Sequence, residues 1–448
     1  MSLPRYLEYR ESGEQWLGSV PAHWEVRRLK TIFEIRKRIA GEEGHQVLSI
    51  TQRGIKLKDI ESNDGQLSMD YSKYQIVCPG DFAMNHMDLL TGFVDISQYV
   101  GVTSPDYRVF SVRNGVRCEP RYFLYLLQNG YRQRVFYAFG QGASEFGRWR
   151  FPTSQFNDFR FPCPPVDEQT AIAAFLERET AKIDALIAEQ EKLIDLLAEK
   201  RQALISHAVT RGLKPDTPMK DSGSVWLGKV PAHWDARPLR YLARIGNGST
   251  PSRDQPDYWA EEGFPWLNSS VVNQEEVTEA RRFVTSKALE ECHLPIVDPP
   301  AVLVGITGQG KTRGMATQLS FTATVNQHLA YIKPDVRQLS VAFLLRCLEA
   351  AYDQLRTESE GGGSTKGAIT CDQLGRLRIP VPPPAEQEDI AAFLDVGCRK
   401  LDVLSAQAEH AIALLKERRN ALIAAAVTGK IDVRGAVRKP ASLEELAA

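Results

Sequence analysis

The sequence predicts an α+β protein with a pseudo-twofold internal repeat. Two globular domains with mostly antiparallel sheets are expected, separated by two long antiparallel coiled-coil helices. Three observations support this prediction: a long helical stretch that occurs twice, a tryptophan-rich box that also occurs twice, and two segments of short strands broken by turn residues.

The repeated helical stretch covers Pro162 to Leu213 and returns from Pro380 to Ile431. In each copy prolines precede a Glu-Gln pair, which opens a run with no further proline and almost no glycine. Apolar residues then recur with a period of 3.5, the pattern of a coiled coil. At about 1.5 Å per residue, each helix would run roughly 65 Å. The expected seam consists of Ile172, Leu176, Ile183, Leu186, Leu193, Leu197 and Leu204, paired with Ile390, Leu394, Leu401, Leu404, Ala408, Ala411, Leu415 and Leu422.

The tryptophan-rich box spans Glu11 to Lys30 and recurs from Asp221 to Arg240, with twelve of twenty positions identical. It is too short for a domain and too apolar for a linker. We expect each copy to pack its large aromatic side chains against the helix ends. The repeated histidines, His23 and His233, are therefore interpreted as packing residues rather than catalysts.

The segments between box and helix differ in sequence but share an order of elements: short strands, a helix, a glycine-rich loop and a last strand before the prolines. We call residues 31–158 the first head and residues 241–376 the second head. The predicted domains are residues 1–160, the first helix at 161–213, residues 214–378, the second helix at 379–431, and a tail at 432–448.

Composition is that of an ordinary globular protein, with 448 residues, 43% hydrophobic residues, 25% charged residues and a net charge of -1. The seven cysteines are scattered, and no apolar run is long enough to target a membrane. These features predict a cytoplasmic protein without a metal site. The near-neutral charge argues against coating nucleic acid through bulk charge, although a reader with locally basic loops remains compatible.

Each head has nearly balanced charge, with 15 Lys and Arg against 14 Asp and Glu in the first, and 13 against 16 in the second. If the heads bind DNA, a few polar and basic loop residues must make the contacts. The candidates are Arg53, Lys56, Lys58, Asn85, Gln141, Arg148 and Arg150 in the first head, and Arg253, Asn268, Ser269, Gln309, Lys311, Arg313 and Lys366 in the second.

Two motifs suggest chemistry that their context does not support. Residues 305–312 match the phosphate-binding pattern G-x-x-x-x-G-K-[ST], but the residues that follow favour an extended chain where a nucleotide site needs a helix. Asp298-Pro299-Pro300-Ala301 resembles the D-P-P-aromatic motif of amino-methyltransferases, yet alanine replaces the stacking aromatic ring. We therefore expect no catalytic residues in this chain.

The repeated S-G-x-x-W-L-G-x-V-P-A-H-W boxes, the repeated P-x-P-P-x-x-E-Q-x-x-I-A-A-F-L helix starts and the G-N-G-S-T-P entry at residues 246–251 together resemble the specificity subunit of type I restriction-modification enzymes. The resemblance covers about residues 10 to 435. It implies two target-recognition domains, each reading one half of a bipartite, asymmetric site on double-stranded DNA, with the helices setting the gap.

The same resemblance implies partners. Two methyltransferase subunits would dock on the helices, and motor-nuclease subunits would join the complex. S-adenosylmethionine, ATP and magnesium would belong to those partners, leaving no cofactor on this chain. Apolar residues off the expected seam are candidates for the docking face, namely Ile187, Ile194, Leu196 and Ile205. The alternative is a non-catalytic adaptor whose two heads bind proteins or glycans.

Overall fold

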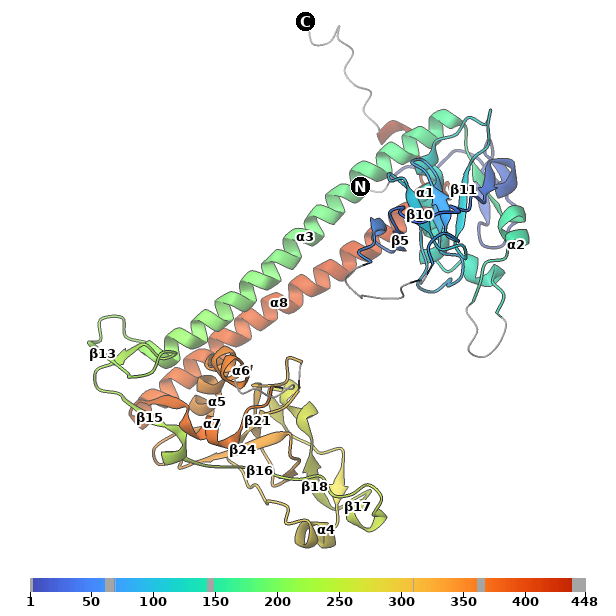
Figure 1. The fold of residues 1–448 in the computed structure, drawn as a ribbon. Coiled ribbons are helices and arrows are strands. Elements are labelled where there is room, and N and C mark those ends of the chain that lie inside the picture. The colour runs from blue at the N-terminus through green and yellow to red at the C-terminus, as the bar shows by residue number, and fades with distance from the viewer. Residues whose placement is uncertain are drawn as a thin grey trace, which may run out of the picture. The chain divides into compact units, whose positions relative to one another are not determined.

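The computed structural model describes residues 3–60, 68, 70–142, 149–308, 310–360 and 367–436 (Figure 1). Its contacts divide the chain into two compact units. Unit 1 comprises Met1–Gln190 and His410–Ala448, and unit 2 comprises Glu191–Glu409. Each unit therefore combines one head with one end of each long helix.

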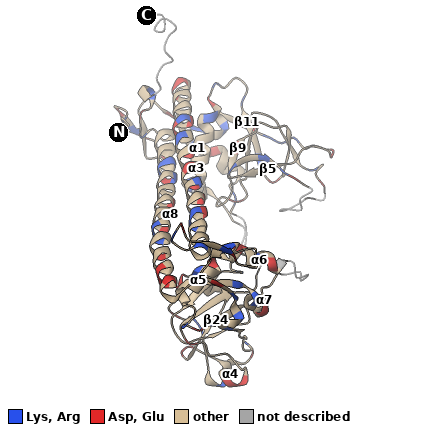
Figure 2. Cartoon of the chain, turned by 90° about the vertical axis from the view of Figure 1, so that its left-hand side faces the viewer, with Lys and Arg blue, Asp and Glu red and all other residues tan. Residues whose placement is uncertain are grey.

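The two long helices are α3 (Val166–Arg211) and α8 (Pro384–Val427). In unit 1 the start of α3 packs with the end of α8, through Ile172 and Leu176 against Ile423 and Val427. In unit 2 the end of α3 packs with the start of α8. The helices are thus antiparallel in each unit, as the sequence predicts. Acidic and basic side chains are interspersed along both helices (Figure 2).

The first head is built on a four-stranded antiparallel sheet in the order β4-β11-β8-β9, with a smaller hairpin and a two-stranded ladder beside it. Its core is rich in phenylalanine, with Phe33, Phe82 and Phe110 in ring contact at 5.1–5.3 Å. The strands before α3 are β1 (Tyr9–Glu11), β2 (Ser19–Pro21), β3 (Glu25–Arg28), β4 (Phe33–Arg36), β5 (Leu48–Thr51), β6 (Gly54–Leu57), β7 (Gln75–Val77), β8 (Phe82–Met84), β9 (Val94–Ile96), β10 (Gly101–Thr103), β11 (Arg108–Val112) and β12 (Arg160–Cys163), of which β4 to β11 belong to the first head, and the helices are α1 (Pro120–Arg132) and α2 (Thr153–Asp158).

The second head contains a five-stranded sheet, β16-β24-β21-β22-β19, and a four-stranded sheet, β17-β20-β18-β23. Only β18–β23 and β19–β22 are parallel among the described strand pairs, so the predicted antiparallel character is confirmed. The strands are β13 (Met219–Asp221), β14 (Lys229–Pro231), β15 (Asp235–Pro238), β16 (Ala243–Asn247), β17 (Trp259–Ala260), β18 (Phe264–Leu267), β19 (Glu276–Val277), β20 (Phe283–Val284), β21 (Ala301–Gly305), β22 (Ala316–Leu319), β23 (Thr324–Val325), β24 (Leu329–Pro334) and β25 (Arg378–Val381), and the helices are α4 (Ser286–Glu291), α5 (Val341–Ala350), α6 (Tyr352–Glu360) and α7 (Cys371–Arg376).

The repeated boxes do pack at the helix ends, as expected. His23 contacts Glu168 on α3 through Nε2 and Oε2 at 2.8 Å, and His233 contacts Glu386 on α8 in the same way at 2.9 Å. Trp234 also donates its indole N–H to Glu386 at 3.0 Å. Each box therefore uses its histidine to hold the glutamate of the Glu-Gln pair, which is a structural role.

The glutamine of each pair fastens the head to its long helix. Gln169, 2% exposed, accepts a hydrogen bond from the backbone N–H of Glu119, the N-cap of α1, at 2.9 Å. Gln387, fully buried, accepts one from the N–H of Ser340, the N-cap of α5, at 2.8 Å. Both amide nitrogens donate to carbonyls of the preceding proline segment. The Glu-Gln pair thus connects each long helix to two parts of the chain. The glutamate binds the box, and the glutamine binds the head.

The predicted seam of α3 is shifted by one residue in the middle of the helix. Leu186 and Leu193 are 46% and 41% exposed, while Ile187 and Ile194 are half-buried. On α8, Leu404 is likewise 47% exposed. At both α3 positions a leucine is followed directly by an isoleucine, and either residue could form the seam. Periodicity alone therefore cannot distinguish the two alternatives. The packing against α8 decides.

Candidate nucleic-acid interface

Three of the predicted DNA-contacting residues of the second head come together around one polar hollow of about 610 Å³. Arg253, Asn268 and Ser269 line it, although fifteen residues separate Arg253 from Asn268 in the sequence. The other lining residues are Thr250, Pro251, Ser252, Trp266, Ser270, Asn326, Gln327 and His328. The hollow therefore collects hydroxyl, amide, imidazole and guanidinium groups, which are the side-chain types that read base edges and grip phosphates.

One wall of the polar hollow is residues 249–253, held by two tryptophans. Trp266 donates its indole N–H to the carbonyl of Ser249 at 3.2 Å, and Trp259 donates to the carbonyl of Ser252 at 3.1 Å. Gly248 permits this approach, because a Cβ at that position would lie 1.8 Å from the carbonyl oxygen of Val325. Gly248, in the Gly246–Pro251 segment, thus brings the wall against the end of β23.

The opposite wall is the turn of residues 326–328 between β23 and β24. Asn326 is 4% exposed, and its side-chain oxygen accepts the backbone N–H of His328 at 3.0 Å. Its own N–H donates to the carbonyl of Leu267 at 2.9 Å, which ties the turn to β18. The exposed Gln327 then projects from a backbone that is fixed on both sides.

Asn268, which was predicted to contact DNA, uses part of its hydrogen-bonding capacity within the fold. Its side-chain oxygen caps the short helix at Ser269–Asn273 by accepting from the backbone N–H and the hydroxyl of Ser270, at 2.9 and 2.6 Å. A second hollow of about 410 Å³, which shares Trp266, Asn268 and Ser270 with the first, includes the exposed Arg281 and Arg282. These arginines, with Thr250, Asn326, Gln327 and His328, were not among the predicted residues.

In the first head, Arg53 and Lys56 lie on the β5–β6 hairpin and are exposed, whereas Lys58 is half-buried. The hairpin is held by side chains at its turn: Gln52 donates to the carbonyl of Thr91 at 3.3 Å, and Asp95 accepts the N–H of Ile55 at 3.0 Å. Arg53 and Lys56 are therefore cations on a fixed support, suited to phosphate contacts.

Gln141 and Arg150 face each other through two backbone hydrogen bonds of 2.8 and 2.9 Å, and both side chains are exposed. Arg148 lies outside the described residues. Next to Arg150, burial together with the positive charges of Arg108 and Arg150 lowers the pKa of His86 to about 3, so His86 is neutral at pH 7. Asn85 is half-buried and its oxygen accepts the N–H of Met87 at 3.2 Å, the role of a turn former.

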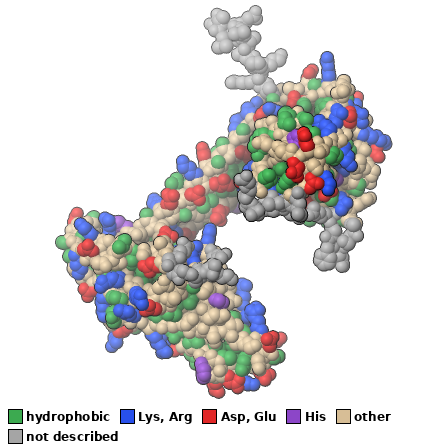
Figure 3. All heavy atoms as spheres, in the orientation of Figure 1, with side chains coloured by type: hydrophobic (Ala, Val, Ile, Leu, Met, Phe, Trp, Pro, Cys, Tyr) green, Lys and Arg blue, Asp and Glu red, His purple; other side chains and the backbone are tan. Residues whose placement is uncertain are grey.

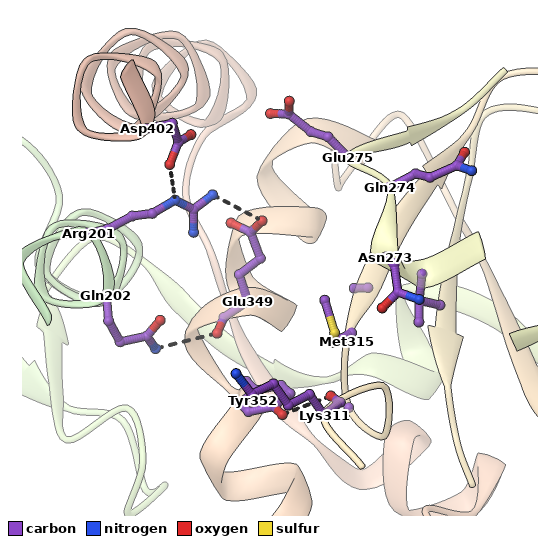
Figure 4. A pocket seen from close by; sticks show the side chains of 13 residues that line it. Arg201, Gln202, Asn273, Gln274, Glu275, Lys311, Met315, Glu349, Tyr352 and Asp402 are labelled. Carbon is purple, nitrogen blue, oxygen red and sulfur yellow. Dashed lines mark hydrogen bonds and ion pairs between the residues drawn. The ribbon is translucent and has the colours of Figure 1, made fainter. Parts of the chain in front are cut away.

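Lys311 lies away from the polar hollow, in a pocket of about 440 Å³ between the second head and the long helices of unit 2 (Figure 4). There Arg201 of α3 contacts Asp402 of α8 at 3.3 Å and Glu349 of α5 at 3.7 Å. Arg313 is 4% exposed, so its position does not fit the predicted contact with DNA. Gln309 and Lys366 lie outside the described residues.

The described residues around the 305–312 segment lie in a strand end and a loop rather than at the start of a helix. After Lys311 the chain makes a turn and enters strand β22, so there is no helix N-terminus to face a phosphate. The carbonyl of Lys311 instead accepts the hydroxyl of Tyr352 at 2.8 Å. The segment is a loop fastened to α6.

The four helix residues predicted to bind a partner do not share one exposed face. Ile205 is fully buried in the core of unit 2, and Ile187 and Ile194 are half-buried toward the seam. Leu196 is 50% exposed. The shift of the seam exposes other apolar residues instead, namely Leu186 and Leu193 on α3 and Phe393, Val396, Val403, Leu404 and Leu414 on α8.

Surface charge is mixed on both heads. Figure 3 shows basic and acidic side chains interspersed over the displayed face of each unit. Among the described residues no group of three or more His, Cys, Asp or Glu residues could hold a metal ion, and no helix is long and apolar enough to cross a membrane. On the displayed faces the mixed charge favours local arrangements such as the polar hollow over a broad positive surface as the place where a charged ligand binds.

Comparison with known proteins identifies the family. A family model described as a type I restriction modification DNA specificity domain matches residues 231–409. A putative type I restriction enzyme MjaX specificity subunit of Methanocaldococcus jannaschii is 25% identical over 437 residues, covering 93% of this chain and 96% of that protein. Residues 231–409 thus carry a type I DNA specificity domain, and nearly the whole chain is similar to a specificity subunit. The function of the chain is the recognition of a DNA sequence.

Other relatives agree with this assignment of the specificity subunit. The type I restriction enzyme MjaIX specificity subunit of the same organism is 30% identical over 172 residues, 38% of each chain. Two solved structures share the fold at 16% identity. One, from a study of complex assembly and conformational transition of the type I R-M system, has a TM-score of 0.69 and covers 91% of this chain and 98% of its own. The other, the HsdS subunit of Thermoanaerobacter tengcongensis, has a TM-score of 0.51, with coverages of 94% and 99%.

Replacing Arg253 with alanine is expected to weaken DNA binding about tenfold, whereas Lys311→Ala should leave it nearly unchanged. The reason is that Arg253 lines the polar hollow with other potential readers, while Lys311 lies in a separate pocket beside the helices. Gel-shift titrations of the assembled complex with its target duplex would measure both effects. Equal losses from the two substitutions would contradict the assignment of the polar hollow as the interface.

Proposed function

We propose that this specificity subunit recognises a bipartite, asymmetric DNA site, with each head reading one half and the two helices setting the length of the gap. The main support for the proposal is that two heads of different sequence are attached to the long helices by the same pair of side-chain contacts. Glu168 and Gln169 connect the first head and its box to α3, and Glu386 and Gln387 make the equivalent contacts in the second. An identical attachment that carries different surfaces is what reading two different half-sites requires.

The surfaces of the two heads support different half-sites. The second head offers the polar hollow, whereas the first offers the cationic β5–β6 hairpin and the Gln141–Arg150 pair. An adaptor that binds proteins or glycans would also need two surfaces, but the family of this chain favours DNA.

We further propose that two methyltransferase subunits dock on the long helices and that motor-nuclease subunits join the larger complex. The exposed apolar side chains of the helices support docking, because isolated helix faces of a soluble protein rarely leave so many large apolar groups in water. On this proposal the chain itself is not catalytic. S-adenosylmethionine, ATP and magnesium would bind the partner subunits, and Leu196 would belong to the docking face together with Leu186 and Leu193.

Co-expression of the chain with its methyltransferase subunits, followed by single-molecule sequencing of methylated bases in the host genome, tests the proposal. The expected result is one motif made of two short specified halves separated by a fixed unspecified gap. A control chain in which residues 241–376 are exchanged for the second head of a relative should change one half only. A continuous motif, or methylation that is the same without this chain, would refute the proposal.

A further inference from the structure

The side-chain amide of Gln327 makes contacts on two sides. The hydroxyl of Thr250 donates to Gln327 Oε1 at 2.6 Å, across 77 residues of sequence. On the other side Gln327 Nε2 lies 3.4 Å from His328 Nε2, and His328 Nδ1 lies 2.7 Å from the hydroxyl of Thr307. Because an amide nitrogen only donates, His328 Nε2 is the acceptor, and Nδ1–H donates to Thr307.

These contacts use half of the hydrogen-bonding capacity of the Gln327 amide. Its oxygen keeps one free lone pair and its nitrogen keeps one free N–H, side by side on an exposed group at the edge of the polar hollow. The turn beneath it is fixed by the buried Asn326. A donor and an acceptor are therefore presented together, on a support that does not need to be ordered when a ligand binds.

We propose that Gln327 reads an adenine in the half-site recognised by the second head, an inference that rests on the proposed function. In the major groove adenine offers an N6 donor beside an N7 acceptor, and a glutamine amide matches both at once. No other base offers this pair in the same arrangement, since guanine shows two acceptors and cytosine a donor alone. Gln327 is thus a specificity-determining residue.

Thr250 and His328 act on the base through Gln327 and are positioning residues. Without the Thr250 hydroxyl the amide is free to rotate and to present its two groups in the reversed order. A reversed amide places its N–H toward the N6 amino group of adenine, where two donors meet. The shape of the wall depends on Gly248, but its contact with Gln327 depends on the single hydroxyl of Thr250.

The test compares methylation of four duplexes that differ only at one base pair of the second half-site, by the assembled complex with its methyltransferase subunits. With Gln327→Ala, the preference for adenine at one position should fall by about tenfold to a hundredfold. With Gln327→Glu, an acceptor-only side chain, the preference at that position should move to cytosine, whose N4 is a donor. The exposed Gln255→Ala serves as the matched control and should leave the motif unchanged.

Positioning is tested with Thr250→Val, which keeps the shape but removes the hydroxyl, and with Thr250→Ser, which keeps the hydroxyl. Valine should relax the choice of base at the same position as Gln327→Ala, and serine should restore it. If the Gln327 variants keep the wild-type motif, or lose activity on all four duplexes alike, the inference is wrong while the proposed function stands. If the wild-type complex gives no bipartite motif, the proposed function itself fails.

Discussion

Replacing Gln387 with leucine is expected to destabilise unit 2 by about 3 to 5 kcal/mol, because the fully buried amide satisfies three backbone groups at once. It accepts from the N–H of Ser340 and donates to the carbonyls of Gln338 and Pro382, at 2.8, 2.8 and 2.9 Å. Leucine fills a similar volume but leaves one donor and two acceptors, on the half-buried Ser340 and Gln338 and the buried Pro382, without these partners. The loss should exceed that of a typical core substitution.

Thermal unfolding of the two variants Gln387→Leu and Gln407→Leu would measure this effect. Gln407 lies on the same helix but is exposed, so its replacement should change the midpoint little. Hydrogen exchange should locate the damage at the start of α5, where the Ser340 amide loses its protection. Equal stability of the two variants would show that the proline segment and α5 hold together without the glutamine.

The fastening of the heads illustrates what the sequence can predict. The Glu-Gln pairs mark the start of each long helix, and the resemblance of the two copies establishes the repeat. What the glutamines do was not predictable, because the partners of Gln387 lie 47 and 49 residues earlier in the chain. A polar residue that is buried at a helix start looks the same in sequence as an exposed one that simply favours the first turn.

The candidate site shows the same limit on what the sequence can predict. Arg253, Asn268 and Ser269 were predicted from residue type alone, and the fold brings them to one hollow. Gln327 and His328 were missed because their role depends on Thr250, which only Gly248 and the two tryptophans bring within reach. Arg313 was predicted for its charge, yet lies buried. Charge and polarity identify candidate DNA-contacting residues in the loops, but long-range packing determines which of them are exposed on the surface.

Inserting heptads into both long helices should change the length of the gap in the recognised site. Each heptad adds a fixed length and a fixed rotation between the two heads. One heptad adds about 10.5 Å to an α-helix, roughly the rise of three base pairs at 3.4 Å each. Three base pairs, however, turn the DNA by about 100° in the right-handed sense at 10.5 base pairs per turn. The same heptad turns a left-handed coiled coil with a pitch of about 150 Å by only about 25° the other way.

A chain with one added heptad in each helix, between Glu189 and Gln190 and between Ala413 and Leu414, should therefore lose methylation, because its heads face different sides of the duplex. Three added heptads give a different result. They lengthen the helices by about 31 Å, close to nine base pairs, and turn the coiled coil by about 75° in the left-handed sense. Nine base pairs turn the DNA to about 50° short of a full turn. The rotation of the coiled coil and the rotation of the duplex therefore differ by only about 25°.

The three-heptad chain is thus expected to methylate a motif with both halves unchanged and a gap longer by about nine base pairs. Sequencing of methylated bases after co-expression with the methyltransferase subunits would report the gap directly. A glycine-rich insert of equal length is the control, since a flexible chain fixes neither distance nor rotation. Methylation by the one-heptad chain with a gap three base pairs longer would mean that the heads swivel on the helices. An unchanged gap in every variant would mean that the helices do not set it, because no rigid spacer can grow by three heptads, about 31 Å, and hold its ends at the old separation.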